Sequence, residues 1–373
     1  MKKRSFSYNN FLMEGKRIYR EDLPDLCIKK KKDPETGPFE QEIFAFIQDF
    51  LSPLKTIHLH TSGSTGTPGK LVVRKEKMIR SARMTGNFLG LKAGDKSLLA
   101  LPVNYIAGKM MIVRALVLGL DLWFTRPSST PDIAQDYDFS ALTPMQVTQL
   151  LKTGNKEKIA RIKNLLIGGG PLSHSLESQL RSLPNRIFHT YGMTETLSHI
   201  AMRRINDPDN TGWFSPLPGI HLSSGLQQNL VIYAPDIIGK KALVTHDIVE
   251  FNGKDNRLFR ILGRTDYIIN SGGIKTFPEE IERKLENRIP FPFFIGSIPD
   301  DILGEKITLF TESGKLSPQE LADIHKAVRS ITDPYRRPRT AMAIYPFLYT
   351  ESGKIKRKET MQKALKSGSS YNL

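Results

Sequence analysis

A stretch rich in glycine and hydroxyl side chains, HTSGSTGTPGK at residues 60–70, combines the groups that proteins use to bind phosphate chains. Gly63 and Gly66 let the backbone turn its N–H groups toward one point, and the serine and threonine hydroxyls around them add further donors. Lys70 offers a charge-assisted contact to an anion. We predict a phosphate-binding loop rather than a surface linker, because a predicted strand precedes it and a predicted helix follows it.

The spacing of this loop differs from that of a Walker P-loop. The Walker motif has the order G-x-x-x-x-G-K-[ST]. Counting back from the lysine, Ser64 stands where the first glycine is required, and Leu71 stands where the hydroxyl residue is required. Pro68 also removes one backbone donor from the loop. An ordinary P-loop is therefore excluded, while a phosphate ligand is still expected.

The segments around this loop alternate between predicted strands and helices. Residues 1–55 are expected to be an irregular, basic entry segment that ends in a helix near 39–51. Beyond it, up to about residue 262, strands are predicted at 56–61, 97–103, 120–125, 139–143, 164–169 and 186–192, and helices at 76–89, 106–119, 144–152 and 173–183. This alternation favours an α/β fold with mostly parallel sheets covered by helices.

Ligands in such folds gather beyond the carboxyl ends of the strands. The loops at 61–70, 168–171 and 191–195 each follow a predicted strand, so we expect them to build one site.

The C-terminal part of the chain has a different pattern. It predicts a short helix at 278–287, strands at 293–298, 306–312 and 341–347, and a helix whose capping box is formed by Ser317 and Glu320. We therefore predict a large N-terminal domain at 1–262, a hinge at 263–266 and a small mobile α+β domain at 267–373.

Length and composition fit a two-domain enzyme. The chain has 373 residues, a formal net charge of +16 and a single cysteine, Cys27. One cysteine excludes an intrachain disulfide and fits a reducing compartment, and no signal peptide or membrane-spanning pattern is found, so we expect a cytoplasmic protein. The basic charge suits nucleic acid or anionic small ligands. No nucleic-acid-binding motif is present, and we expect small-molecule ligands, no membrane insertion and, as an open alternative, a homodimer.

Further motifs follow in a fixed order along the chain. HTSGSTGTPGK resembles the phosphate-binding signature of the adenylate-forming enzymes (acyl- and aryl-CoA synthetases, adenylation domains and luciferases), although Lys70 is displaced by one place from the family's T-S-G-S/T-T-G-x-P-K-G. The other matches are GGGPL at 168–172, YGMTE at 191–195, THD at 245–247 with His246 in place of glycine, GRTDYIINSGGIKTFPEEIE at 263–282 and TESGKIKR at 350–357.

This resemblance implies a reaction in two halves. A carboxylate attacks the α-phosphate of ATP and gives an acyl-adenylate and pyrophosphate, and a thiol, usually that of coenzyme A, then displaces AMP. Lys354 would stabilise the first step, and the C-terminal domain would then swing at Asp266 between two poses. In the second pose the loop Ser271, Gly272 and Gly273 would line the coenzyme A channel.

The resemblance also assigns the nucleotide contacts. Asp247 would bind the ribose hydroxyls, with Arg264 as a second contact to ribose and phosphate. Thr194 would donate to the α-phosphate, and Glu195 would hold Mg²⁺, a hard cation that prefers oxygen. Tyr191 would stack on adenine, with core packing as the alternative. The remaining contacts implied by the motifs are Thr61, Ser62, Gly63, Ser64, Thr65, Gly66, Lys70, Gly168, Gly169, Gly170, Gly192 and Met193.

The acid is expected to lie near LPVNYIAGKMM, residues 101–111. The short chain and this segment look most like the o-succinylbenzoate–CoA ligases of menaquinone biosynthesis. Such an acid carries a second carboxylate, and we predict Lys109, or less favourably Arg203, as its cation. Tyr105 and Gly108 complete the expected acid pocket.

Several alternatives stay open. A CoA ligase for another aromatic or short acid, an adenylation protein that loads a carrier protein, and a non-catalytic nucleotide-binding relative all share these motifs. His58 and His60 alternate along a predicted strand and lack a third ligand nearby, which favours strand polarity over a metal site. The segment 334–338 is interpreted as a surface turn, with contact to coenzyme A phosphates as the alternative.

Overall fold

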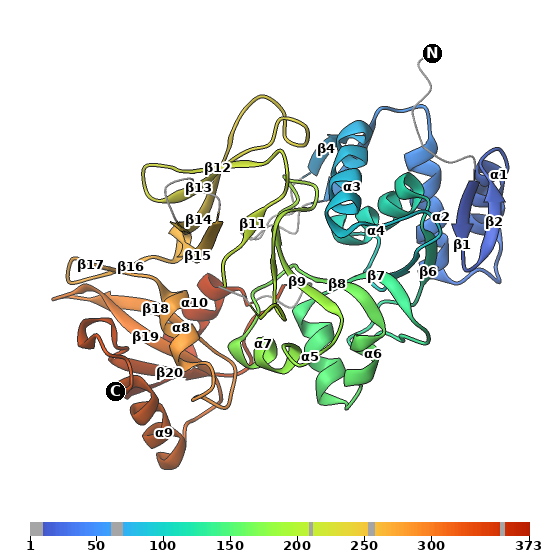
Figure 1. The fold of residues 1–373 in the computed structure, drawn as a ribbon. Coiled ribbons are helices and arrows are strands. Elements are labelled where there is room, and N and C mark those ends of the chain that lie inside the picture. The colour runs from blue at the N-terminus through green and yellow to red at the C-terminus, as the bar shows by residue number, and fades with distance from the viewer. Residues whose placement is uncertain (1–9, 61–69, 209–211, 253–257, 351–354) are drawn as a thin grey trace.

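The computed structural model describes residues 10–60, 70–208, 212–252, 258–350 and 355–373. Figure 1 shows a large N-terminal part, in blue to yellow, and a smaller C-terminal part, in orange to red. The largest sheet runs in the order β11-β10-β9-β8-β7-β5-β6-β1-β2, and its centre from β9 to β1 is parallel. Its strands are β1 (Asn10–Met13), β2 (Lys16–Tyr19), β5 (Lys96–Leu99), β6 (Asp121–Phe124), β7 (Tyr137–Leu142), β8 (Ile162–Ile167), β9 (Arg186–Gly192), β10 (His199–Arg204) and β11 (Ser215–Pro216).

Helices cover both faces of this sheet. Alternate residues of a strand point to opposite faces, and on β8 Leu166 joins one core cluster while Leu165 and Ile167 join the other. The first cluster is covered by α2 (Pro38–Leu51), α3 (Lys75–Leu89) and α4 (Ile106–Leu118), and the second by α5 (Pro144–Lys152), α6 (Lys156–Ala160) and α7 (His174–Leu180). The predicted α/β arrangement is therefore observed.

The entry segment is more ordered than the sequence suggested. It forms the hairpin β1–β2 and the helix α1 (Leu23–Lys32), and β1 pairs in parallel with β6. The buried Asp121 carboxylate accepts hydrogen bonds from the Gly15 amide (3.0 Å) and the Trp123 indole (2.8 Å). This acidic residue interrupts an apolar stretch of the sequence because it anchors a distant hairpin.

The predicted phosphate loop lies between two strands rather than between a strand and a helix. β3 (Thr56–His60) pairs antiparallel with β4 (Lys70–Arg74) in a sheet of their own, and α3 begins after β4. The strand β4 was not predicted. Alternating strands and helices were expected up to about residue 262, but residues 199–264 are largely antiparallel β structure: after β10 and β11 come β12 (His221–Ser224), β13 (Asn229–Tyr233), β14 (Leu243–Asn252) and β15 (Leu258–Arg264).

The C-terminal part has its own sheet, in the order β17-β16-β19-β20-β21, with β18 paired to β19. Its elements are η1 (Thr265–Tyr267), β16 (Ile269–Ser271), β17 (Ile274–Thr276), α8 (Pro278–Leu285), β18 (Phe293–Asp300), β19 (Gly304–Glu312), α9 (Pro318–Arg329), η2 (Pro334–Arg336), β20 (Thr340–Ile344), α10 (Arg357–Ser367) and β21 (Ser369–Asn372). Ser317 and Glu320 form the predicted capping box.

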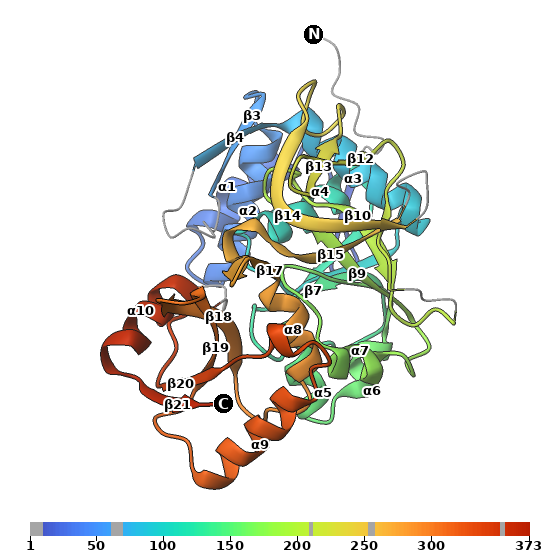
Figure 2. The same cartoon turned by 90° about the vertical axis from the view of Figure 1, so that its left-hand side faces the viewer.

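The two parts have separate hydrophobic clusters. Buried core residues of the N-terminal part lie between Phe11 and Phe259, and those of the C-terminal part lie between Ile269 and Ala364. Figure 2 shows the C-terminal elements gathered beside β15 and α7. The division at 263–266 stays a prediction. No helix among the described residues is long and apolar enough to cross a membrane.

Gly108 provides a test of how closely α4 packs against residues 101–102. A Cβ atom there would lie 2.2 Å from the Pro102 carbonyl oxygen, whereas a Cβ atom at Gly37 would meet nothing within 4 Å. We expect Gly108→Ala to lower the free energy of unfolding by roughly 1–3 kcal/mol through overpacking. Gly37→Ala, the matched control, should change it by less than about 0.5 kcal/mol. Equal denaturation midpoints for the two variants would contradict the close approach of α4 to residues 101–102.

Candidate active site

Two of the predicted site loops lie side by side. β8 and β9 are neighbouring parallel strands, so the Gly168–Gly170 loop and the loop that begins at Gly192 leave the same edge of the sheet. The Gly169 backbone has φ +86, which favours glycine, and a Cβ atom at Gly168 would lie 2.3 Å from the Thr190 hydroxyl oxygen. The glycines therefore allow the two loops to pack closely.

The loop after β9 is folded tightly onto itself. A Cβ atom at Gly192 would lie 2.4 Å from the Ser198 carbonyl oxygen. The Met193 amide donates to the Thr196 hydroxyl (2.9 Å), and the Leu197 amide donates to the Thr194 carbonyl (3.0 Å). Thr194 is half-buried and the Glu195 side chain is exposed. The loop thus presents a carboxylate at its surface, as a ligand for a bound cation requires.

Tyr191, Asp247 and Arg264 form one connected polar chain. The Tyr191 hydroxyl donates to Asp247 Oδ2 (2.6 Å), and the Arg264 guanidinium donates to Asp247 Oδ1 (3.0 Å) and to Asp266 (2.9 Å). Burial, and to a smaller extent the nearby Asp247 charge, raises the pKa of Tyr191 well above its ordinary value, so the hydroxyl stays protonated. The Tyr191 ring packs edge-on against Phe214 and Phe259.

These contacts give Tyr191 and Asp247 structural roles in addition to their predicted ones. The hydrogen bonds among Tyr191, Asp247 and Arg264 link β9, β14 and β15 to the predicted hinge. Tyr191 was expected to stack on adenine, with core packing as the alternative, and adenine stacking stays a prediction.

His246 is the residue where this chain departs from the family's T-G-D motif. Its Nδ1 atom lies 3.0 Å from Asp266 Oδ1, so the predicted hinge carboxylate is contacted by His246 on one side and Arg264 on the other. Burial raises the pKa of Asp266, but the hydrogen bond from Arg264 and the neighbouring positive groups lower it overall. Asp266 is therefore held as a carboxylate between two basic side chains.

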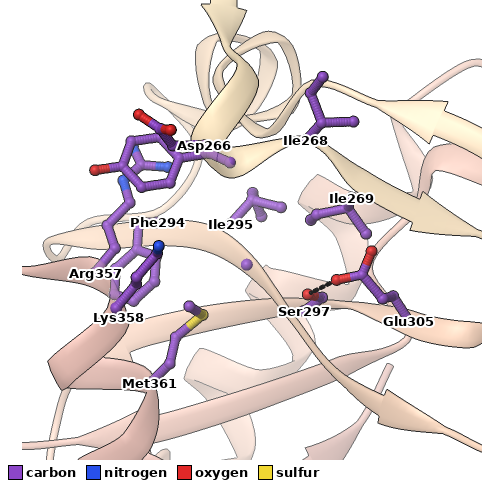
Figure 3. Close-up of a pocket in the computed structure, with 12 residues that line it drawn as sticks. Asp266, Ile268, Ile269, Phe294, Ile295, Ser297, Glu305, Arg357, Lys358 and Met361 are labelled. Carbon is purple, nitrogen blue, oxygen red and sulfur yellow. Dashed lines mark hydrogen bonds between the residues drawn. The ribbon is translucent and has the colours of Figure 1, made fainter. Parts of the chain in front are cut away.

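A cavity of about 210 Å³ lies next to this hinge. Figure 3 shows Asp266 and Arg357 at one end and the hydrogen bond from Ser297 to Glu305 at the other. The Arg357 guanidinium lies over the rings of Tyr267 (4.9 Å) and Phe294 (5.6 Å). It also donates to Glu282 of α8 (2.8 Å). The start of α10, just after residues 351–354, is thereby fixed against the hinge.

The predicted coenzyme A loop is the turn of the β16–β17 hairpin. Gly272 and Gly273 have φ +58 and φ +83 and connect paired strands directly, as a two-residue hairpin with positive φ requires. Both glycines are exposed and Ser271 is buried. The turn geometry alone explains the glycines, and the contact with coenzyme A stays a prediction.

The two predicted cations for the acid both have partners inside the protein. The Lys109 ammonium donates to the Val103 carbonyl and lies 5.3 Å from the Phe46 ring centre on α2, and burial lowers its pKa. Arg203 forms a buried ion pair with Glu177, with one guanidinium nitrogen 3.1 Å from the carboxylate. The Tyr105 backbone precedes α4, and Gly108 is buried against residues 101–102.

Sequence reasoning missed Arg114, which lies in α4 with an exposure of 2 %. Its guanidinium donates to the Ser198 hydroxyl, faces the Phe139 ring at 5.9 Å and leaves its Nε atom without a partner. Among the described residues no carboxylate forms an ion pair with it. Burial lowers its pKa to about 9, so it remains a cation at neutral pH. Its signal in the sequence is an arginine inside the apolar run MMIVRALVLGL.

A directional chain of hydrogen bonds continues from Arg114. Ser198 contacts His199 Nδ1 (3.2 Å), and His199 Nε2 contacts the Thr85 hydroxyl (3.0 Å), which donates to the Ser81 carbonyl. Burial, and to a smaller extent the Arg114 charge, lowers the pKa of His199 well below its ordinary value. The imidazole is therefore neutral and adds no second positive charge beside Arg114.

Some predicted residues lie outside the described part of the chain, and their roles stay predictions. The strand β4 begins at Lys70. Among the described residues no group of three or more histidine, cysteine, aspartate or glutamate side chains could hold a metal ion. The residues outside are Thr61, Ser62, Gly63, Ser64, Thr65, Gly66 and Lys354.

Comparison with known proteins identifies the family. Residues 56–222 match the family model of the AMP-binding enzymes. The chain is 32% identical to a protein of known structure from Dyadobacter fermentans, described as an acyl-CoA synthetase (AMP-forming)/AMP-acid ligase II-like protein. That match covers 91% of this chain and 98% of the other, with a TM-score of 0.60. The chain belongs to the AMP-binding, adenylate-forming enzymes.

Other similar proteins carry a more specific name. A 2-succinylbenzoate–CoA ligase from Enterococcus faecalis is 25% identical over 334 residues, which is 80% of this chain and 67% of that relative. The structure of o-succinylbenzoate coenzyme A synthetase from Bacillus subtilis, in complex with ATP and magnesium, has a TM-score of 0.68 at 20% identity and covers 82% of this chain. The family and the fold expected from the sequence of this adenylate-forming enzyme are confirmed.

Glu279 of α8 lies against the last strand of the N-terminal part of this adenylate-forming enzyme. A Cβ atom at Gly263 would lie 2.6 Å from its Oε2 atom, which is buried without a partner. Burial raises the pKa of Glu279 to about 7, although the Arg357 charge opposes the shift. The folded protein therefore keeps this proton to higher pH than the unfolded chain does.

This shift predicts a pH-dependent stability. Because the folded-state pKa is raised, stability should fall as the pH rises from about 4.5 to about 7, by roughly 2–3 kcal/mol. Glu279→Gln removes the ionisation and should be more stable than the parent protein by that amount at pH 8 and equal to it near pH 4.5. Denaturant titrations at both pH values measure this difference.

Glu280→Gln is the matched control, because Glu280 forms a partly exposed ion pair with Arg336. It should not stabilise the protein at pH 8. A Glu279→Gln variant with no advantage at pH 8 would show that this carboxyl is not held protonated.

Proposed function

We propose that this adenylate-forming enzyme is an ATP-dependent acid–CoA ligase whose acid carries a second carboxylate, and that this acid is o-succinylbenzoate. The acid would attack the α-phosphate of ATP to form an acyl-adenylate and release pyrophosphate. The thiol of coenzyme A would then attack the acyl carbon and release AMP. The product would serve menaquinone biosynthesis in the cytoplasm, and a homodimer remains part of the proposal.

The buried cation Arg114 is the observation that carries the choice of acid. A charge in the protein interior costs several kcal/mol unless an opposite charge meets it. Arg203 on β10 has Glu177 as its counter-ion. Among the described residues, Arg114 instead contacts the Ser198 hydroxyl, the Phe139 ring and the Met111 thioether, and it forms no ion pair with a carboxylate. A substrate carboxylate beside Ser198 would supply the missing negative charge through charge-assisted hydrogen bonds.

The location of Arg114 also fits an acid site. Its helix, α4, begins within the LPVNYIAGK segment, and Ser198 follows the YGMTE loop that is proposed to hold the reacting phosphate. The relatives named 2-succinylbenzoate–CoA ligase support the same acid.

The nucleotide would be held by the hydrogen-bonded side chains of Tyr191, Asp247 and Arg264 at the edge of the sheet. Asp247 has both oxygens engaged by Tyr191 and Arg264 and would accept the ribose hydroxyls as a preorganised carboxylate. Thr194, at the tip of the loop after β9, would donate to the α-phosphate. Lys354 is proposed to bridge the attacking carboxylate and the phosphate in the first step.

Glu195 is the residue that fits a magnesium ion. Its carboxylate is exposed on the loop after β9, and the described residues contain no cluster able to hold a metal without substrate. A single carboxylate that completes its coordination with phosphate oxygens is the usual arrangement for Mg²⁺. Bound there, the ion would neutralise phosphate charge.

An acid panel tests the proposed activity. Pyrophosphate release should depend on the acid, with o-succinylbenzoate preferred over benzoate and short monoacids, and a CoA thioester should form when coenzyme A is added. Adenylate formation without transfer to coenzyme A would favour a carrier protein as acceptor. Preference for another acid would identify a different ligase of the family, and release that depends on no acid would overturn the proposal.

Substitution of Arg114 tests the choice of acid. Arg114→Met removes the charge and keeps much of the side-chain volume. We expect the KM for o-succinylbenzoate to rise about 10- to 100-fold, as the loss of a charged hydrogen bond of roughly 1.5–3 kcal/mol predicts. The KM for ATP should not change. The melting temperature should stay equal or rise, because a buried cation without a counter-ion is removed.

Lys109→Met is the control for the cation predicted from the sequence. Because the Lys109 ammonium already contacts Val103 and Phe46, this variant should keep the KM for o-succinylbenzoate. An increased KM in Lys109→Met together with an unchanged KM in Arg114→Met would assign the second carboxylate to Lys109 instead.

A further inference from the structure

His189 on β9 is a buried histidine to which the proposed reaction assigns no role. Its exposure is 8 %, and it lies two residues before Tyr191 on the same strand. Its two ring nitrogens contact different parts of the protein. Nε2 lies 3.2 Å from the Gly170 carbonyl oxygen, and Nδ1 lies 3.3 Å from Arg203 Nε.

The partners of His189 determine where its proton lies. An arginine Nε–H can only donate, so His189 Nδ1 must accept from Arg203. A carbonyl oxygen can only accept, so the ring proton lies on Nε2 and is donated to Gly170. The imidazole is therefore neutral. Burial, and to a smaller extent the Arg203 charge, lowers the pKa of His189 to about 4, in agreement with this assignment.

Arg203 is itself fixed on its other side. Its guanidinium pairs with Glu177 of α7, both side chains are 10% exposed, and it lies 5.5 Å from the centre of the Phe214 ring. The His189 ring packs against the same phenylalanine at 5.1 Å. The array from Glu177 through Arg203 and His189 to Gly170 thus connects α7, β10 and β9 with the loop after β8.

The Gly168–Gly170 loop is consequently held at both ends. At its start the Gly168 amide donates to the Leu142 carbonyl of β7 (3.1 Å). At its end the Gly170 carbonyl accepts from His189. Between them Gly169 has a positive φ, which side chains of other residues rarely adopt. A loop with little intrinsic order is therefore fixed by one backbone bond and one side-chain bond.

We propose that His189 is a positioning residue for the adenine ring of ATP: its Nε2–H holds the Gly170 carbonyl, and the Arg203–Glu177 pair fixes the tautomer that can do so. This inference rests on the proposed function, because it uses the glycine loop as the surface along which adenine lies. A fixed loop binds the base without first losing conformational freedom. His189 acts through the loop and is not expected to contact the nucleotide.

Two substitutions separate the two bonds of His189. In His189→Gln the terminal amide reaches the Nε2 position and can still donate to Gly170. In His189→Asn the amide occupies the Nδ1 position and is too short to reach Gly170. We expect AMP binding, measured by calorimetry, to weaken about tenfold in His189→Asn and less than threefold in His189→Gln. The KM for ATP should follow the same order, while kcat and the KM for the acid stay within about twofold.

Two outcomes would overturn the proposal. One is an AMP affinity that is equal in the parent protein and in both variants. The other is an equal loss of AMP affinity in both variants together with a lowered melting temperature. The first would show that the loop needs no hydrogen bond from His189, and the second that the ring is needed only for packing. If the parent protein bound no AMP, the proposed function itself would fail.

A measurement on the unmodified protein covers the case in which a variant does not fold. ¹⁵N-detected spectra of the imidazole should show His189 protonated on Nε2 and unprotonated on Nδ1 between pH 6 and 8. The Nε2–H signal should shift when AMP is added and stay unchanged with the acid alone. A ring protonated on Nδ1, or one insensitive to AMP, would overturn the inference.

Discussion

The carboxylate of Asp247 is the contact on which the arrangement of the site depends. It accepts from Tyr191 at the end of the central sheet and from Arg264 at the end of β15, two strands that belong to different sheets. Arg264 in turn contacts Asp266 at the hinge. Because a buried carboxylate is costly without donors, the same bonds that satisfy it also fix the proposed ribose site relative to the predicted hinge.

Charge pairing distinguishes two buried arginines of the N-terminal part. Arg203 and Arg114 both lie buried near the strands that lead to the YGMTE loop. The first is neutralised by Glu177 and is used to orient His189, so it serves the shape of the adenine loop. The second lacks a counter-ion among the described residues, and we propose that a substrate carboxylate supplies one. This difference in charge pairing distinguishes an arginine with a counter-ion in the protein from one that is proposed to select the substrate, and residue type alone does not reveal it.

The hinge region combines close packing with unsatisfied polar groups. Gly263 allows the Glu279 carboxyl to approach the last N-terminal strand. Within the described part of the chain, Glu279 Oε2 and Arg357 Nη1 are both buried without hydrogen-bond partners. A buried polar group without a partner costs free energy, and such a cost would favour opening of this contact if the predicted C-terminal domain swings at the predicted hinge. A cavity of about 210 Å³ lies beside Asp266 and Arg357.

The sequence alone determined the family, the α/β class, most helix positions, strands β5 to β9 of the main sheet and the capping box of Ser317 and Glu320, because these depend on motif order and on local periodicity. Tertiary structure decided which residues became partners over long distances. The β1–β2 hairpin is anchored by Asp121, 106 residues from Gly15, and Tyr191 meets Asp247 56 residues further along the chain. Lys109 was a reasonable candidate from its position, yet its ammonium faces α2, whereas Arg114 is left unpaired in the interior. No local pattern encodes that difference, because the cost of a buried charge depends on every side chain packed around it.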